Sequence, residues 1–186
     1  MKRNPFDNFP PFQLLHDACD VGYIGEPVSQ LSHALQCAQA AQDDRTSPEL
    51  VAAALLHDIG HLCAAPEAQH MGDLGVVAHE WVGARYLANH GLSADVCALV
   101  VGHVAAKRYL VTTDLHYLDR LSSASLATLE LQGGPMSAAE VLRFEAEPLH
   151  REMLRLRTYD EQAKAPFAQV ASLGSYLPLI EQLRKR

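Results

Sequence analysis

The stretch AALLHDIGH, residues 53–61, places His57 and Asp58 side by side at the end of an apolar helical run, with His61 one turn later. An imidazole and a carboxylate that enter a glycine turn from an alanine- and leucine-rich helix are costly to bury unless something pairs with them. A metal ion is the simplest partner, because neutral imidazole and ionised carboxylate together suit Zn, Mn or Fe. The stretch therefore predicts metal chemistry and leaves open whether that chemistry is hydrolysis or oxidation.

Further candidate ligands fall on other helical stretches. His33, His79 and His103 each lie on a separate one. Taken singly they are weak candidates, because a lone histidine on a half-buried helix is more often a hydrogen-bonded core or surface residue. A later acidic residue would complete the set, and spacing alone does not choose among Asp114, Asp119, Glu130 and Asp160.

Helices must position these residues, because helical periodicity dominates the chain and the alternating pattern of strands is essentially absent. Ser47, Ser93 and Ser137 are expected N-caps, and Pro27 and Pro48 suit first helical positions. Ser137 also begins a capping box. The expected helices are 11–20, 27–42, 48–60, 76–90, 94–103, 113–122, 123–131, one that follows Ser137, and 176–185, with a long basic segment at 150–164.

The length of 186 residues suits one core. We expect a single domain over 1–186, with a metal-binding core at about 21–164 and a C-terminal helix at about 176–185. A net charge of −7 argues against general affinity for nucleic acid or anionic membranes. A helix that spans a membrane needs an uninterrupted apolar run of roughly 20 residues, and no run in the sequence approaches that length.

The address of the protein is predicted from its N-terminus and its cysteines. The start MKRNPFDNFPPF lacks the apolar block of a signal peptide. The four cysteines form no CxxC pair and mostly have apolar neighbours, which fits buried free thiols in a reducing compartment. We therefore expect a cytoplasmic protein.

The order of His33, the pair His57-Asp58 and a distant Asp resembles the HD-domain superfamily of metal-dependent helical proteins. The resemblance implies an all-α, HD-domain helical bundle around a dinuclear metal site, and it selects Asp160 in RLRTYDEQAK as the last ligand. Asp58 would bridge the two ions. One ion would take His33, His57 and Asp160, and the other His79 and His103. Because two metals can polarise a phosphate and generate hydroxide, this ligand set alone favours a phosphohydrolase.

A narrower resemblance favours oxidation. The segments YIGEPVSQLSHALQCA, LLHDIGHLC, GHVAAKRYLV, LSSASLATLELQGGPM and RLRTYDE resemble the 2-amino-1-hydroxyethylphosphonate dioxygenases, which are related to myo-inositol oxygenase. The likeness covers about 21–164. It implies a mixed-valent Fe(II)/Fe(III) pair, O2 as co-substrate, and cleavage of a carbon–phosphorus bond, which lacks the leaving group of a phosphate ester.

The same resemblance implies which side chains bind the phosphonate. His61, Lys107 and Arg157 would supply donors and positive charge, with Ser125 and Thr128 beside them. His61, Lys107 and Tyr23 are the candidate catalytic side chains. Without the resemblance, the same residues read as surface charges, helix fillers and a packed aromatic.

The turn YIGE precedes the helix that carries His33. The resemblance implies that Tyr23 can occupy the iron position that substrate later takes and that Glu26 faces the cationic nitrogen of the substrate. Gly22 and Gly25 allow backbone change, so we interpret the turn as a lid. Asp73 stands where the amino-substrate enzymes have glycine. A second carboxylate near the pocket favours the trimethylammonio analogue, although Asp73 is equally well read as an exposed loop acid.

Three hypotheses follow. The first is a di-iron oxygenase that converts a 1-hydroxy-2-ammonioethylphosphonate, trimethylated or primary, into phosphate plus glycine betaine or glycine. It would act downstream of an enzyme that hydroxylates the phosphonate at C1, with no nucleic acid or membrane partner. The second is an HD-domain phosphohydrolase for a phosphomonoester or nucleotide. The third is a metal-stabilised binding module without turnover. The sequence does not choose the alkyl substituents of the nitrogen, the stereochemistry or the oligomeric state.

Overall fold

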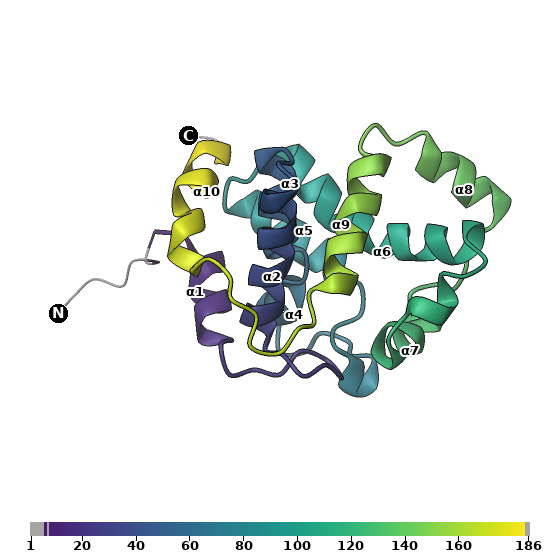
Figure 1. Ribbon diagram of the computed structural model, residues 1–186, viewed down its shortest axis with the longest axis horizontal. Helices are drawn as coiled ribbons and strands as arrows, with labels where there is room; N and C mark the ends of the chain where they lie inside the picture. The colour runs from purple at the N-terminus through teal and green to yellow at the C-terminus, as the bar shows by residue number, and fades with distance from the viewer. Residues whose placement is uncertain (1–5, 7, 185–186) are drawn as a thin grey trace.

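The computed structural model describes residues 6 and 8–184, which fold into helices joined by turns (Figure 1). Within this part of the chain, extended pairing is limited to the isolated bridges Gly22–Ser29 and His70–Val76. The all-α prediction is confirmed. The α-helices are α1 (Pro10–Asp17), α2 (Gln30–Asp43), α3 (Pro48–Leu56), α4 (Gly60–Cys63), α5 (His79–Asn89), α6 (Ala94–Thr113), α7 (Ser123–Leu131), α8 (Ala138–Glu145), α9 (His150–Gln162) and α10 (Leu177–Leu183), with 3-10 turns η1 (Gly72–Leu74), η2 (Leu118–Arg120) and η3 (Leu173–Tyr176).

Helix α3 forms the centre of the bundle. Ser47 caps it by accepting a hydrogen bond from the Leu50 N–H, and every residue from 50 to 56 is buried. A helix that is apolar all round must be covered on all sides, and α3 packs against α2, α6, α9 and α10. Its last turn therefore delivers His57 and Asp58 into the middle of the molecule.

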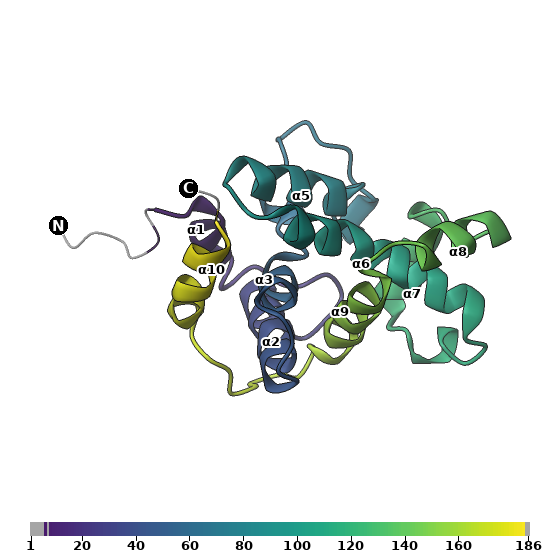
Figure 2. The same cartoon turned by 90° about the horizontal axis from the view of Figure 1, so that it is seen from above.

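The other helices that carry candidate ligands surround this point. In both views α2, α3 and α9 lie together, while α1 and α10 occupy one end and α7 and α8 the other (Figures 1 and 2). Helix α6 runs across the bundle and packs against α3, α5 and α9. By length and composition alone α6 would suffice to cross a membrane, yet half of it is buried inside the protein, as in the core helix of a bundle.

Several helix starts match the prediction because they depend on local hydrogen bonds. Ser93 caps α6, and Ser137 and Glu140 form the reciprocal capping box of α8. The start at Pro27 is wrong. Residues 22–29 form a turn closed by hydrogen bonds from Tyr23 N to Val28 O and from Gln30 N to Val21 O, and Ser29 caps α2 instead.

Several other boundaries differ from the prediction, and α1 and α3 end three to four residues earlier than expected, at Asp17 and Leu56. A helix over 113–122 is wrong, because α6 continues to Thr113 and Asp114 then takes extended backbone and accepts a hydrogen bond from the His116 N–H. Helix α5 begins at His79 rather than residue 76, because Ala78 adopts a left-handed φ of 55°. The last helix begins at Leu177 and ends at Leu183; position 185, where its end was predicted, lies outside the described residues.

The four cysteines are free, as predicted. The prediction that these thiols are buried is only partly confirmed. Cys37 is buried, whereas Cys63 and Cys97 are half-buried and Cys19 is exposed. Apolar neighbours in sequence therefore did not place these thiols in the core.

The contact between α4 and α5 requires Gly60. A Cβ at this position would lie 1.9 Å from the His79 carbonyl oxygen and 2.9 Å from the Gly83 nitrogen. Because both are main-chain atoms, Gly60→Ala must separate the two helices, and we expect the free energy of unfolding to fall by about 1–3 kcal/mol. Urea denaturation of the metal-free protein measures this. Gly174→Ala is the control, because its Cβ would meet nothing within 4 Å; equal midpoints for both variants would contradict the close approach.

Candidate metal centre

Six predicted ligands, drawn from five parts of the chain, meet beside the end of α3. His33 comes from α2, His57 and Asp58 from the turn after α3, His79 from the start of α5, His103 from α6 and Asp160 from α9. The four imidazoles and Asp160 are buried, and Asp58 is nearly so. The competing acidic residues lie elsewhere: Asp119 and Glu130 are exposed, and Asp114 pairs with Arg120.

Asp58 divides the cluster into two sets of donor atoms. Its Oδ2 lies 3.2 Å from His57 Nε2 and 3.8 Å from His33 Nε2. Its Oδ1 lies 3.2 Å from His79 Nε2 and 3.5 Å from His103 Nε2. Asp160 joins the first set, with Oδ1 at 3.4 Å from His33 Nε2. One carboxylate thus faces two places where an ion could sit, and the assignment of ligands to ions stays a prediction.

The orientation of the rings suits a metal. His33, His57 and His103 donate Nδ1–H to the carbonyls of Ala163, Ala54 and Val100, respectively, at 3.0, 2.9 and 2.6 Å. Because a carbonyl only accepts, each neutral ring has its lone pair on Nε2. The Nε2 atoms face one another, with His33 Nε2 and His57 Nε2 3.2 Å apart and His79 Nε2 and His103 Nε2 3.1 Å apart. Two lone pairs at such a distance repel unless a proton or a metal cation lies between them.

The titration behaviour of the cluster also indicates that it attracts positive charge. Burial is the largest influence on His57 and lowers its pKa, but the Asp58 carboxylate overcomes this and raises the pKa to about 9. Burial by itself would raise the pKa of Asp160, but the Arg157 guanidinium and His33 hold that pKa well below its usual value. A metal cation would satisfy the same groups that otherwise draw a proton.

Arg157 orients Asp160. Its Nη1 donates to Asp160 Oδ2 at 2.5 Å, and its Nε donates to Glu161 Oε1 at 2.8 Å and to the Tyr117 hydroxyl at 2.9 Å. The Tyr117 hydroxyl in turn donates to Glu161. Its Nη2 donates to Ser125 Oγ at 3.4 Å, so all three guanidinium nitrogens donate to protein acceptors, although the side chain also lines the neighbouring cavity.

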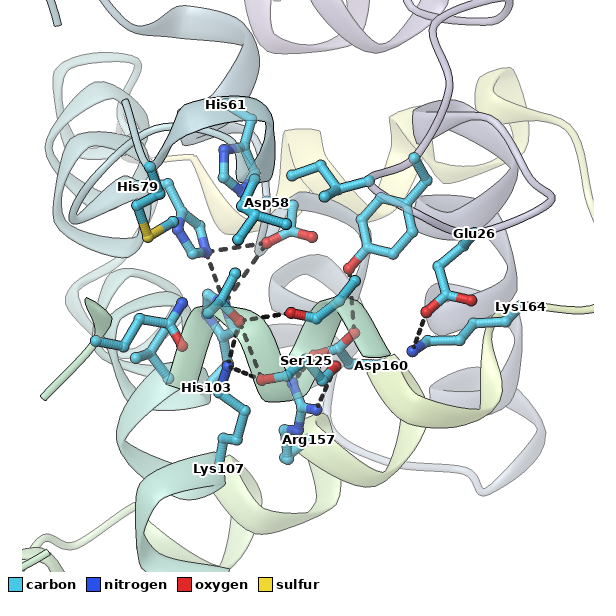
Figure 3. A pocket seen from close by; sticks show the side chains of 18 residues that line it. Glu26, Asp58, His61, His79, His103, Lys107, Ser125, Arg157, Asp160 and Lys164 are labelled. Carbon is cyan, nitrogen blue, oxygen red and sulfur yellow. Dashed lines mark hydrogen bonds and ion pairs between the residues drawn. The ribbon is translucent and has the colours of Figure 1, made fainter. Parts of the chain in front are cut away.

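A cavity of about 50 Å³ opens beside the cluster. Among the predicted substrate-binding residues, Tyr23, Glu26, His61, Lys107, Ser125, Thr128 and Arg157 line it, together with Asp58, His79, His103 and Asp160 (Figure 3). Asp73 does not. It is exposed in η1, while its neighbours Met71 and Leu74 reach the wall. The structure therefore gives no support to Asp73 as a specificity residue.

Lys107 provides a buried amine at one wall of the cavity. Its Nζ donates to Thr128 Oγ1 at 2.8 Å and to the Ser125 carbonyl at 3.3 Å. Burial, followed by repulsion from Arg157, lowers its pKa to about 7. An anion in the cavity would favour the charged form of this amine.

The tautomer of His61 is set by the main chain. The Val76 N–H donates to its Nδ1 at 3.0 Å, and the ring stacks on His79 with centroids 4.0 Å apart. Burial lowers the pKa of His61 to about 4. The neutral ring must then carry its proton on Nε2, so it offers a hydrogen-bond donor through that atom. Gly75 permits this stacking, because a Cβ there would lie 2.5 Å from His61 Cε1.

The YIGE turn covers the opposite side of the site. The Tyr23 ring stacks on His33 with centroids 3.8 Å apart, and its hydroxyl donates to Asp160 Oδ1 at 3.5 Å. Glu26 pairs with Lys164, with 2.7 Å between Oε1 and Nζ. In Figure 3 this pair lies on the side of the pocket away from His79 and His103.

Sequence reasoning missed three polar side chains. Lys164 lines the cavity and donates to Ser122 Oγ at 3.0 Å as well as pairing with Glu26. Gln132 lines it with a buried Oε1 that accepts no hydrogen bond from the described residues. Cys37 Sγ lies 3.7 Å from His33 Nε2, one helical turn along α2. The spacing of Cys37 from His33 was a usable signal, whereas nothing local marks Lys164 or Gln132.

The two donor sets predict separate losses of metal. Metal-free protein titrated anaerobically with a divalent ion should bind two equivalents, His33→Ala and His103→Ala should each lose one, and Asp58→Ala should weaken both. The reason is that only Asp58 has an oxygen facing each set. Metal content and calorimetry measure the result. His90→Ala is the control, because that ring bonds the Tyr86 carbonyl outside the cluster. Loss of both equivalents in each single-histidine variant, with circular dichroism unchanged, would contradict the division.

Comparison with known proteins agrees with this architecture. A family model described as "HD domain" matches residues 30–151. The chain is 38% identical over 164 residues to the [1-hydroxy-2-(trimethylamino)ethyl]phosphonate dioxygenase (glycine-betaine-forming) of Leisingera caerulea, covering 88% of this chain and 83% of the relative. It is 39% identical over 174 residues to the hydroxymethylphosphonate dioxygenase of Gimesia maris, covering 91% and 84%.

A third relative is the uncharacterized protein L432 of Acanthamoeba polyphaga mimivirus, 39% identical over 159 residues, or 85% of this chain and 73% of the relative. Asp160 lies beyond the segment matched by the family model. The resemblance inferred from the motifs is confirmed, as is the helical architecture that it implied. The chain belongs to the HD-domain family.

Proposed function

We propose that the protein is a di-iron oxygenase that splits the carbon–phosphorus bond of a small 1-hydroxyphosphonate. The observation that carries the proposal is the contact between two features: a two-part His and Asp cluster, and a cavity whose wall adds Lys107, Ser125 and Thr128. Two relatives that cover most of the chain are named as phosphonate dioxygenases, which supports the same chemistry. The preferred substrate is 1-hydroxy-2-(trimethylammonio)ethylphosphonate or its primary amine.

Different side chains of the cavity bind different parts of the substrate. Lys107 supplies positive charge to the phosphonate, and the Nε2–H of neutral His61 donates to it from the other side. Arg157 holds Asp160 in place and so acts on the cluster more than on the substrate. At the far side, Glu26 provides the carboxylate for a cationic tail.

Two iron ions held by the six ligands would supply the reduction of O2 and the oxidation of C1. The mixed-valent Fe(II)/Fe(III) state is part of the proposal. The overall reaction balances with one O2 for each substrate: the C–H and C–P bonds at C1 break, C1 becomes a carboxylate, and phosphorus leaves as inorganic phosphate. Tyr23, stacked on His33 with its hydroxyl at Asp160, covers the cluster and limits the access of water.

The protein would act after another enzyme, in a reducing compartment. Its substrate must be made by an enzyme that hydroxylates the parent phosphonate at C1. We place it in the cytoplasm, where its four free cysteines stay reduced. We also propose that the whole chain is one domain, because α1 packs on α2, which carries His33, and α10 packs on α3, which leads directly into His57 and Asp58.

Oxygen dependence separates the proposed oxygenase from an HD phosphohydrolase. Iron-loaded protein given either hydroxyphosphonate should release phosphate only in air, with one O2 consumed for each phosphate, because C1 must lose electrons for the C–P bond to break. An oxygen electrode and a phosphate assay measure this ratio. Phosphate release under strict anaerobiosis, or release from a phosphomonoester with Mn or Mg in place of iron, would favour hydrolysis.

The ion pair of Glu26 with Lys164 predicts how the enzyme distinguishes substrates with a cationic group from those without one. Lys164→Met should raise kcat/KM for the 2-ammonio substrate relative to hydroxymethylphosphonate by about tenfold, because Glu26 would be released from an ammonium 2.7 Å away. Glu26→Gln should shift the same ratio in the opposite direction. Steady-state kinetics on both substrates measure it. A ratio that stays constant while both rates change would show that the pair only supports the fold.

A further inference from the structure

His79 differs from the other three imidazoles of the cluster in what its second nitrogen faces. His33, His57 and His103 each donate Nδ1–H to a main-chain carbonyl. The Nδ1 of His79 instead lies 3.6 Å from the Glu80 Oε2. Both atoms are buried, and neither has a hydrogen-bond partner among the described residues.

Two complementary groups left apart in the interior carry an energetic penalty. A buried carboxylate oxygen and a buried imidazole N–H each lose their bonds to water without replacement. The gap of 3.6 Å is a few tenths of an ångström longer than a hydrogen bond. His79 Nδ1 and Glu80 Oε2 are therefore natural hydrogen-bond partners for each other.

A metal on Nε2 would strengthen this bond. When one imidazole nitrogen binds a cation, the proton on the other becomes a better donor, and an anionic acceptor makes the ring a stronger ligand than a neutral carbonyl does. Besides His79, the predicted ligands of this set are His103 and Asp58, while the His61 ring also lies close to His79 and Asp58. Fewer predicted protein ligands surround His79 than surround His33. Each ligand near His79 should therefore contribute more to the affinity for the metal ion.

We propose that Glu80 is a positioning residue that orients His79 and raises its strength as a metal ligand, so that the two metal positions differ in the charge of their surroundings. The inference rests on the proposed ligand role of His79 and is independent of substrate or oxygen. The competing explanation is that Glu80, an acid in the first turn of α5, only stabilises the helix N-terminus. Asp95 is the matching acid in the first turn of α6, and its exposure leaves it no buried imidazole to orient.

Metal titration separates these explanations. In Glu80→Gln, one of the two equivalents should bind about 10- to 100-fold more weakly than in the wild type, while the other keeps its affinity. Asp95→Asn is the matched control and should bind both equivalents normally. The melting temperatures of the two metal-free variants should be similar. Equal affinities in Glu80→Gln and the wild type, or equal weakening of both equivalents, would overturn the inference.

A spectroscopic measurement tests the hydrogen bond directly. In the Zn-loaded wild type, the His79 Nδ1 proton should give a low-field imidazole resonance in the NMR spectrum, which Asp95→Asn keeps and Glu80→Gln shifts to higher field. The absence of that resonance in the folded wild type would overturn the inference even if Glu80→Gln failed to fold. If the wild type does not bind two equivalents, the proposed metal site itself fails, which is a distinguishable result.

Discussion

The structure depends on one buried carboxylate that faces two groups of imidazoles. Asp58 can occupy this place only because α3, an apolar helix covered on every side, ends at Leu56 and turns into the middle of the bundle. The carboxylate recovers what it loses by leaving water only if positive charge lies between its oxygens and the Nε2 atoms of His57 and His79, each 3.2 Å away. The surrounding helices are then constrained to bring imidazoles, and not apolar side chains, to this point. Packing and chemistry therefore share the same centre.

Local chemistry explains what the sequence predicted well. Ser47, Ser93 and Ser137 each satisfy main-chain N–H groups a few residues away, so their helices begin where the sequence indicates. Helix starts set by main-chain conformation were less predictable. The bridge between Gly22 and Ser29 closes the turn at 22–29, so α2 begins only after Ser29. The left-handed conformation of Ala78 likewise moves the start of α5 to His79. Periodicity cannot detect either constraint, because both are main-chain conformations.

The candidate site follows the same rule. The pair His57-Asp58 was visible as adjacent polar residues that an apolar helix would bury, and the resemblance supplied Asp160, which spacing could not choose. Lys164 remained hidden because its partners, Glu26 and Ser122, lie far away in the chain. Glu80 was hidden for another reason, since an acid in the first turn of a helix has an ordinary explanation. Asp73, prominent in sequence, is exposed and outside the cavity.

The ligands are far apart in the sequence, from His33 in α2 to Asp160 in α9. A polypeptide emerging from the ribosome therefore cannot complete the cluster until α9 has been released, although α2 and α3 can pair well before that. The full set of donors can therefore select its metal only after α9 has emerged.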